Sequence, residues 1–141
     1  MSFKKKGKKG LRRLVILLLS VCILGGCKKE AKEEVEYLDF TVLAPEEIPD
    51  PFLLMIAERQ EAPFQLSYQD GTLLYLAVGY GLQQSGGYSI QVPAFYTDGE
   101  TMVLDTTLIG PESTPTGGDI AKSCPYIVIM TQYRDLPVVY E

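Results

Sequence analysis

The sequence contains no histidine and only three cysteines. Without histidine, the chain has neither a Ser-His or Cys-His nucleophile pair nor a His-ligated zinc site. Cys22 and Cys27 lie in or beside an N-terminal leader, so the remainder of the chain has one thiol, Cys124. One thiol forms no internal disulfide and no Cys-rich metal site, and we expect Cys124 to be a small buried side chain. We therefore expect a domain that is stabilised by packing, binds no metal or cofactor, and is not an enzyme.

Positive charge is also scarce beyond the leader. All 18 acidic residues follow Cys27, whereas seven of the 13 basic residues precede it, so the chain from Cys27 onward has a net charge of −12. A nucleic-acid partner requires clustered Lys and Arg to release counterions, so it is not expected. Direct adhesion of the polypeptide to an anionic membrane is disfavoured for the same reason. We also expect no small-molecule substrate.

The leader has a cluster of Lys and Arg, then an apolar run over residues 14–24, then two glycines before Cys27. This order is typical of a secretory signal peptide. The alternative is an uncleaved transmembrane anchor, but the run is shorter than the roughly 20 residues that a spanning helix needs. The segment Leu24-Gly25-Gly26-Cys27 resembles the lipobox of bacterial lipoproteins. This resemblance implies cleavage before Cys27, lipid on its thiol, and a location on the extracytoplasmic face of the cell membrane.

Three segments are therefore expected: a signal peptide over residues 1–26, a lipidated cysteine with a charged tether over 27–35, and one β domain over 36–141. In the last segment, Asp50 and Pro51 indicate the start of a short helix over residues 51–62. Asp70-Gly71 and Asp98-Gly99 predict tight hairpin turns, and Pro93 predicts a sheet edge or a bulge. The fold class is mainly β, an antiparallel sandwich or partly open barrel with one short N-terminal helix. The expected strands cover residues 40–43, 64–68, 72–78, 88–97, 100–109, 126–132 and 136–140.

Two segments, residues 79–87 and 110–123, are longer than turns require, and long loops on a β scaffold often bind partners. In the first, the glycines permit positive φ, and Tyr88 has the character of an aromatic anchor. The alternative is that the glycines only bend a hairpin and that Tyr80 and Tyr88 pack on the sheet. Asp70, Asp98 and Glu100 are explained by turn chemistry and not by acid–base catalysis. The candidate partner-binding residues are Leu82, Ser85, Gly86, Gly87 and Tyr88.

Two motifs resemble those of a known family. Ser85-Gly86-Gly87-Tyr88-Ser89-Ile90 lies between two expected strands, and Cys124-Pro125-Tyr126 begins a β-branched strand. Together they resemble the C-terminal domain of PrcB-type proteins, over roughly residues 66–139, with Ser85 where threonine is usual and Cys124 where tyrosine is usual. The resemblance implies a non-enzymatic module that binds a protein partner and stabilises a secreted or surface protease complex.

The same loop has a fainter likeness to chagasin-type inhibitors of cysteine proteases. It shares the Gly-aromatic end, Gly87-Tyr88, but lacks the Asn-Pro-Thr part of the inhibitor loop. This likeness implies a second function, inhibition of a protease through the loop from Ser85 to Tyr88.

Overall fold

The computed structural model describes residues 34–113, 117–118 and 120–141. Cys27, the expected signal peptide and most of the expected tether lie outside these residues. Among the residues described, no helix is both long enough and apolar enough to cross a membrane.

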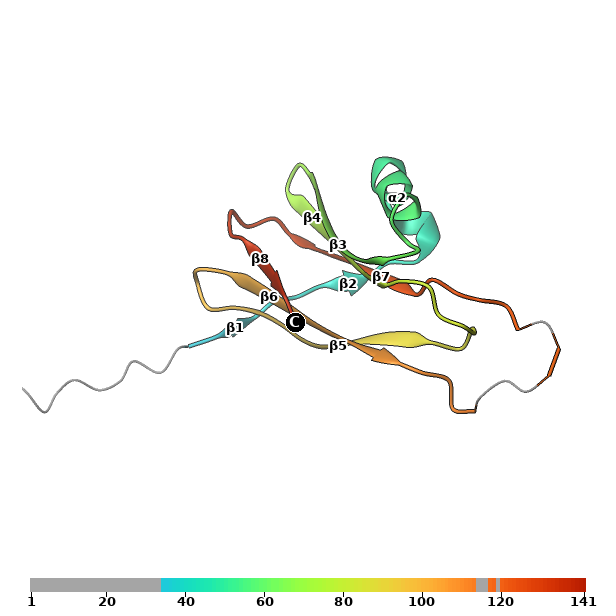
Figure 1. Ribbon diagram of the computed structural model, residues 1–141. Helices are drawn as coiled ribbons and strands as arrows, with labels where there is room; N and C mark the ends of the chain where they lie inside the picture. The colour runs from blue at the N-terminus through green and yellow to red at the C-terminus, as the bar shows by residue number, and fades with distance from the viewer. Residues whose placement is uncertain (1–33, 114–116, 119) are drawn as a thin grey trace, which may run out of the picture. The chain divides into compact units, whose positions relative to one another are not determined.

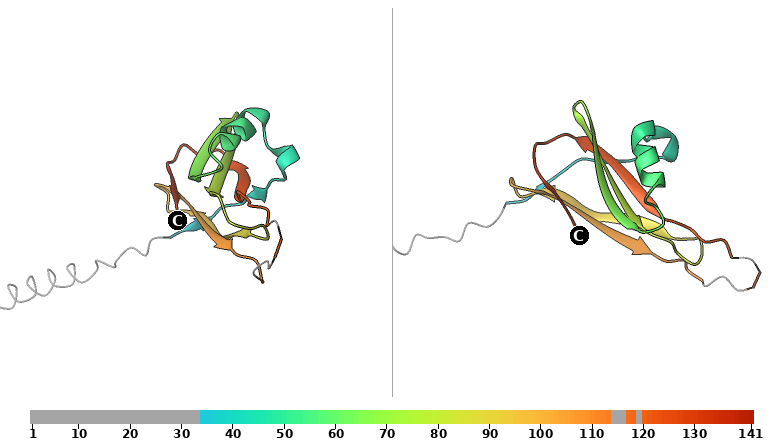
Figure 2. Two further views of the ribbon diagram at one scale, coloured as in Figure 1. Left: turned by 45° about the vertical axis from the view of Figure 1, so that its right-hand side comes forward. Right: turned by 45° about the horizontal axis from the view of Figure 1, so that its top comes forward.

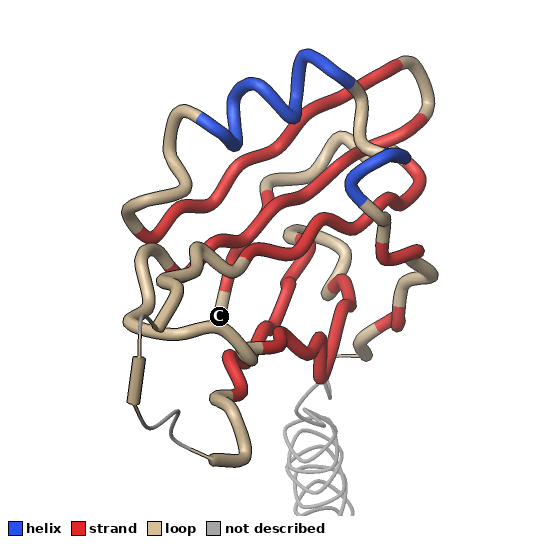
Figure 3. The backbone as a smooth tube through the Cα atoms, turned by 90° about the vertical axis from the view of Figure 1, so that its right-hand side faces the viewer, coloured by secondary structure: helices blue, strands red, loops and turns tan. Residues whose placement is uncertain are grey.

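The described chain forms two four-stranded sheets (Figures 1 and 3). In the first, named the β5–β6 sheet, the order is β1-β5-β6-β8, and in the second, the β4–β7 sheet, it is β2-β7-β4-β3. All pairs are antiparallel except β6 with β8. The sheets do not close into one barrel, which confirms a mainly β sandwich. The strands are β1 Glu36–Tyr37, β2 Thr41–Val42, β3 Pro63–Asp70, β4 Leu73–Tyr80, β5 Ser89–Thr97, β6 Met102–Ile109, β7 Tyr126–Gln132 and β8 Val138–Tyr140.

Strand β4 is the centre of the fold, because both of its faces are covered. Leu74, Leu76 and Val78 point into a core between the two sheets. Tyr75 and Ala77 point into a second core beneath helix α2 (Asp50–Ala57), which lies on the far side of the β4–β7 sheet (Figure 2). An apolar run of this kind predicts a central strand, and the pairing of β4 with both β3 and β7 confirms it.

The helix is shorter than expected. It ends at Ala57 and not at residue 62, because the chain must turn before Pro63 begins β3. Backbone hydrogen bonds from Arg59 N to Ile56 O and from Ala62 N to Arg59 O make that turn. Asp50 is not the cap but the first helical residue, after Pro49 and a short 3₁₀ helix over Pro45–Glu47.

Both predicted turns differ in detail. Asp70 pairs with Leu73, so the two-residue loop is Gly71-Thr72, and only Gly71 has positive φ (61°). Positive φ at the first central residue alone matches a type II′ turn and not type I′. The second turn has four residues, 98–101, because Thr97 pairs with Met102.

The expected strand over residues 40–43 is present as β2, and a further short strand, β1, precedes it in the other sheet. β1 pairs with β5 and β2 pairs with β7, so the chain crosses from one sheet to the other between them. Leu38 lies at the crossing, where its N–H donates to Phe95 O over 2.9 Å and its side chain is buried. Further along, the pairing of β5 with β6 shifts between Gln91 and Ala94, so the prediction of a bulge at Pro93 is confirmed.

Gly79 belongs to strand β4 and not to the loop that follows. It pairs with Phe64 on β3, and the Phe64 ring lies where a Cβ on Gly79 would be. This arrangement is an aromatic side chain covering a cross-strand glycine. The glycine is therefore required for close approach within the sheet.

We expect Gly79→Ala to lower the free energy of unfolding by about 1–3 kcal/mol, the usual cost of overpacking a core. Phe64 cannot move aside freely, because it is 9% exposed and packed beneath α2. Urea denaturation measures the effect. The same change should cost less in a Phe64→Leu background, where the ring is absent. An equal cost in both backgrounds would refute the steric explanation.

Candidate functional site

The two long loops meet at one end of the sandwich, where β4 leads into β5 and β6 leads into β7 (Figure 1). Gln83 and Ser123 form a β-bridge, with Gln83 N to Ser123 O at 2.7 Å and Ser123 N to Gln83 O at 3.1 Å. The Ser123 hydroxyl also donates to Ser85 O over 2.6 Å. We call residues 81–88 with the described part of 110–125 the loop end. Both loops therefore lie beside the start of β7.

The five candidate residues have different surroundings within the loop end. Leu82 is 45% exposed, and Gly86 is exposed with open space around it. Ser85 is 8% exposed and donates its hydroxyl hydrogen to Gly86 O, so it shapes the loop from inside. Among the five candidate residues, Leu82 therefore has the most exposed apolar side chain.

Gly87 and Tyr88 complete the turn into β5. Gly87 has φ 84°, and a Cβ there would lie 3.0 Å from the Pro111 side chain, so glycine is required for both conformation and space. Gly86 does not have positive φ, so of the two glycines only Gly87 uses this conformational freedom. Tyr88 is half-buried against Gly110 of the other loop. The ring therefore joins the loops and still presents part of its surface.

The backbone conformation around Leu82 is fixed by its neighbours, with the side chain exposed to solvent. Gly81 has φ 75° and turns the chain against Pro63, and Leu82 N–H donates to Glu61 O over 3.0 Å. Two further apolar side chains at or beside the loop end are also exposed, Ile120 at 40% and Ile109 at 36%. Neither side chain was predictable from the sequence, because the segment around Ile120 has no apolar periodicity and Ile109 has the pattern of an ordinary strand residue.

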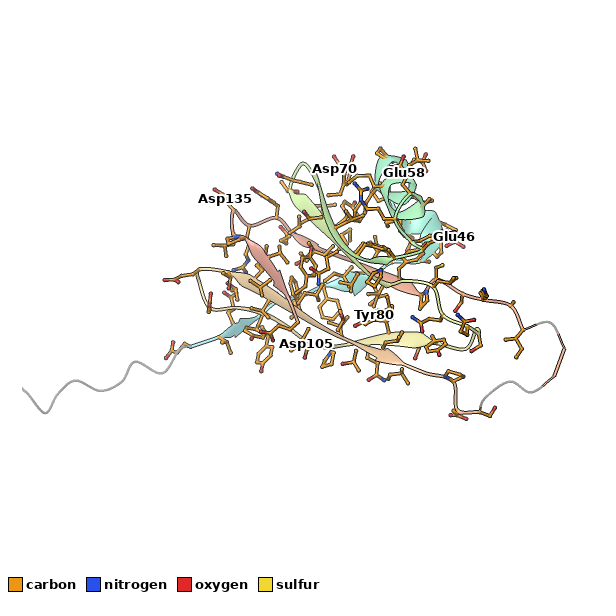
Figure 4. All side chains as sticks on the ribbon, viewed as in Figure 1. Glu46, Glu58, Asp70, Tyr80, Asp105 and Asp135 are labelled. Carbon is orange, nitrogen blue, oxygen red and sulfur yellow. The ribbon has the colours of Figure 1, made fainter. Side chains whose placement is uncertain are left out.

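Tyr80, in contrast, is structural. Its hydroxyl lies 2.7 Å from the Thr106 hydroxyl of the opposite sheet, and its ring packs against the core between the sheets. Figure 4 shows Tyr80 between the sheets, whereas the labelled acidic side chains point outward. The alternative that Tyr80 packs on the sheet is therefore correct, and Tyr80 is not part of the exposed surface of the loop end.

Asp98 closes its own turn. Asp98 Oδ1 accepts hydrogen bonds of 2.8 Å from the N–H groups of Thr101 and Glu100, and these bonds lower the pKa of Asp98 below its ordinary value. These hydrogen bonds are the turn chemistry that the sequence predicts for Asp98. In the part of the chain that the structure covers, no three Asp, Glu or Cys side chains are placed to hold a metal ion.

Cys124 is half-buried and not fully buried as expected. It lies beside the edge of β7, where it lines a shallow groove with Val42, Pro45 and Tyr126. The edge is open there because β2 pairs only with Ile129 and Met130 of β7.

The comparison with known proteins gives one match. Residues 74–132 match the family model described as PrcB C-terminal. No curated protein and no solved structure matches the chain. The matched segment runs from β4 to β7 and includes both loops of the loop end, and it covers the motifs on which the resemblance rests. The chain is therefore similar to the PrcB C-terminal family over residues 74–132, somewhat less than half of its length.

Proposed function

We propose that this chain is a lipid-anchored extracytoplasmic protein whose β domain binds and stabilises a protein partner, a secreted or surface protease. The observation that carries the proposal is the family match, because it spans both loops of the loop end. The lipobox-like segment ending at Cys27 supports the location, and the absence of histidine supports a role that is not catalytic. The lipid on Cys27 would hold the protein at the membrane, and the domain would contact the partner.

The loop end has the properties of a contact surface. Its two loops are tied at Gln83 and Ser123 by a β-bridge, so these two positions have less conformational entropy to lose on binding. Leu82 and Ile120 present apolar surface, and Tyr88 presents an aromatic ring with a polar tip. Aromatic side chains of this kind supply much of the binding free energy in protein interfaces. Within the loop end, Ser85 and Gly87 then act as shaping residues, and Leu82 and Tyr88 as contact residues.

We expect Tyr88→Ala to weaken partner binding by about 2 kcal/mol, roughly 30-fold, with little change in the melting temperature. The Tyr88 ring rests on Gly110, which has no side chain to collapse into the space that the truncation leaves. Calorimetric titration with the partner protease measures affinity, and thermal unfolding measures stability. Tyr88→Phe keeps the ring and is the matched control. Lost stability with normal binding by the remaining folded fraction would show that Tyr88 is a core residue.

A second function, inhibition of the protease, uses the same surface. The observation that favours it is the rigid presentation of Leu82, since pre-organised exposed loops are typical of protease inhibitors. The two functions differ in what the protease does when the domain is added. An inhibitor blocks hydrolysis of a short peptide substrate, whereas a stabilising subunit leaves hydrolysis intact and lengthens the half-life of the active protease. We expect the second result.

A further inference from the structure

Four side chains form a row across the outer face of the β5–β6 sheet. In the register of the sheet, Tyr37 pairs with Tyr96, Tyr96 with Val103, and Val103 with Val139. Residues that pair across strands point to the same face. The neighbouring residues Phe95 and Leu104 point into the core, so this row points away from it. We call these four residues the outer row.

The outer row is apolar and partly open to solvent. Tyr37 is 73% exposed and Val139 is 41% exposed at the two ends of the row. The rings of Tyr37 and Tyr96 meet edge to face, with centroids 6.2 Å apart. Val103 is 7% exposed, because Tyr96 and Val139 flank it. In an antiparallel sheet with one face in solvent, the residues on that face are normally polar. Packing of the core therefore does not explain why the outer row is apolar.

Three carboxylates surround the row. Asp105 is the next outward residue of β6 after Val103, and Asp98 follows β5. Glu141 lies beside Asp105, because its N–H donates to Leu104 O at 2.9 Å and its carbonyl accepts from Thr106 N at 3.1 Å. Burial and the negative charges of Glu141, Asp98 and Asp105 raise the pKa of Tyr96 above its ordinary value.

These carboxylates have no cationic partner in the part of the chain that the structure describes. The one ion pair found there joins Arg134 to Glu36 at 3.1 Å. Like charges on neighbouring strands are destabilising, so the adjacent Asp105 and Glu141 oppose folding. The three carboxylates are too dispersed to form a metal site among the described residues. A larger cation with apolar surface fits this arrangement better than a metal ion does.

We propose that the outer row docks a basic peptide segment of a partner protein, one in which Arg or Lys alternates with apolar residues. One arginine side chain would lie on the exposed ring of Tyr37 as a cation–π contact, and a second basic side chain would pair with Asp105 or Glu141. The alternate apolar side chain would cover Val139. The complementary charge selects this occupant over an anionic membrane, which the same carboxylates repel.

The surface is separate from the loop end. In Figure 1, β1 and the turn from β5 to β6 lie at one end of the β5–β6 sheet, and the loops lie at the other. The inference therefore goes beyond the proposed function. It can fail while binding at the loop end remains, and it can hold even if the loop end binds nothing.

The test uses the purified full-length protein in detergent and a short peptide that alternates arginine and leucine. We expect the peptide to bind wild type, and Tyr37→Ala to weaken binding by about three- to fivefold, the usual range for an exposed cation–π contact. The double variant Asp105→Asn/Glu141→Gln should weaken binding by roughly threefold or more and reduce its salt dependence. Tyr37 is largely exposed, so Tyr37→Ala should retain the wild-type melting temperature.

A charge-matched control distinguishes the effect of the carboxylates beside the outer row from the effect of the net charge of the domain. Glu46→Gln/Glu58→Gln removes the same charge at exposed positions near α2, where Figure 4 shows both side chains pointing outward. This control should bind the peptide as wild type does. Equal weakening in the two double variants, or unchanged binding by Tyr37→Ala, would overturn the proposal. Binding to phosphatidylglycerol vesicles that Tyr37→Ala abolishes would also overturn it, because the outer row would then be a membrane contact.

Discussion

Replacing Phe52 with alanine is expected to lower the free energy of unfolding by about 3–5 kcal/mol. Phe52 lies on the buried face of α2 and is fully buried. Its ring stacks on Tyr68 with centroids 5.5 Å apart and also contacts Tyr75. The helix that carries Phe52 has only eight residues, so no neighbouring turn can fill the cavity. A domain of this size is stable by about 5–15 kcal/mol in total. The single change is therefore expected to remove a large share of the stability.

The matched control lies on the same helix. Leu54 is 67% exposed, so Leu54→Ala changes side-chain size at a position that buries little surface. We expect that variant to stay within about 0.5 kcal/mol of wild type. Urea denaturation followed by circular dichroism compares the two variants. Similar losses in both would show that α2 does not form a core with the β4–β7 sheet.

Replacing Cys27 with alanine is expected to abolish lipid attachment completely, because the thiol is the acyl acceptor in the lipoprotein hypothesis. Each acyl CH₂ that enters the bilayer contributes about 0.8 kcal/mol, so loss of the chains removes the expected anchor. Mass spectrometry of the membrane fraction should find an unprocessed precursor without acyl mass. Cys22→Ala changes the other leader cysteine, inside the apolar run, and should be processed as wild type. Unchanged lipidation of Cys27→Ala would contradict the hypothesis.

The strands were predictable where a local pattern was strong. The run from Leu73 to Val78 is apolar on both faces, and such a run has no stable place except between two layers. The strand over residues 40–43 was predicted and contains β2, but the separate strand β1 was not predictable, because it has two residues and the crossing at Leu38 depends on backbone pairing with Phe95. The Asp-Gly turns were located to within a residue or two. Their types depend on the pairing register, which the dipeptide alone does not determine.

The sequence predicts the two loops of the candidate site, but it does not predict which of their residues are buried and which are exposed. The glycines indicated a bend near Tyr88, and Gly87 does have positive φ. The burial of Ser85 depends on Ser123, a contact across 38 positions of sequence, so no local signal could indicate it. The outer row is similar, since Tyr37 and Val139 become members of one surface only through the register of three intervening pairs.

The most direct test of the central claim, that the loop end binds a protein partner outside the cytoplasm, is photo-crosslinking in intact cells. A photoreactive side chain is placed at position 82, and a matched one at position 54 on α2, both exposed in the structure. We expect position 82 to crosslink to a secreted or surface protease, position 54 not to do so, and Tyr88→Ala to reduce the position-82 adduct. Crosslinks of equal yield at both positions, or no protein adduct at position 82 together with substrate turnover by the purified protein, would contradict the account.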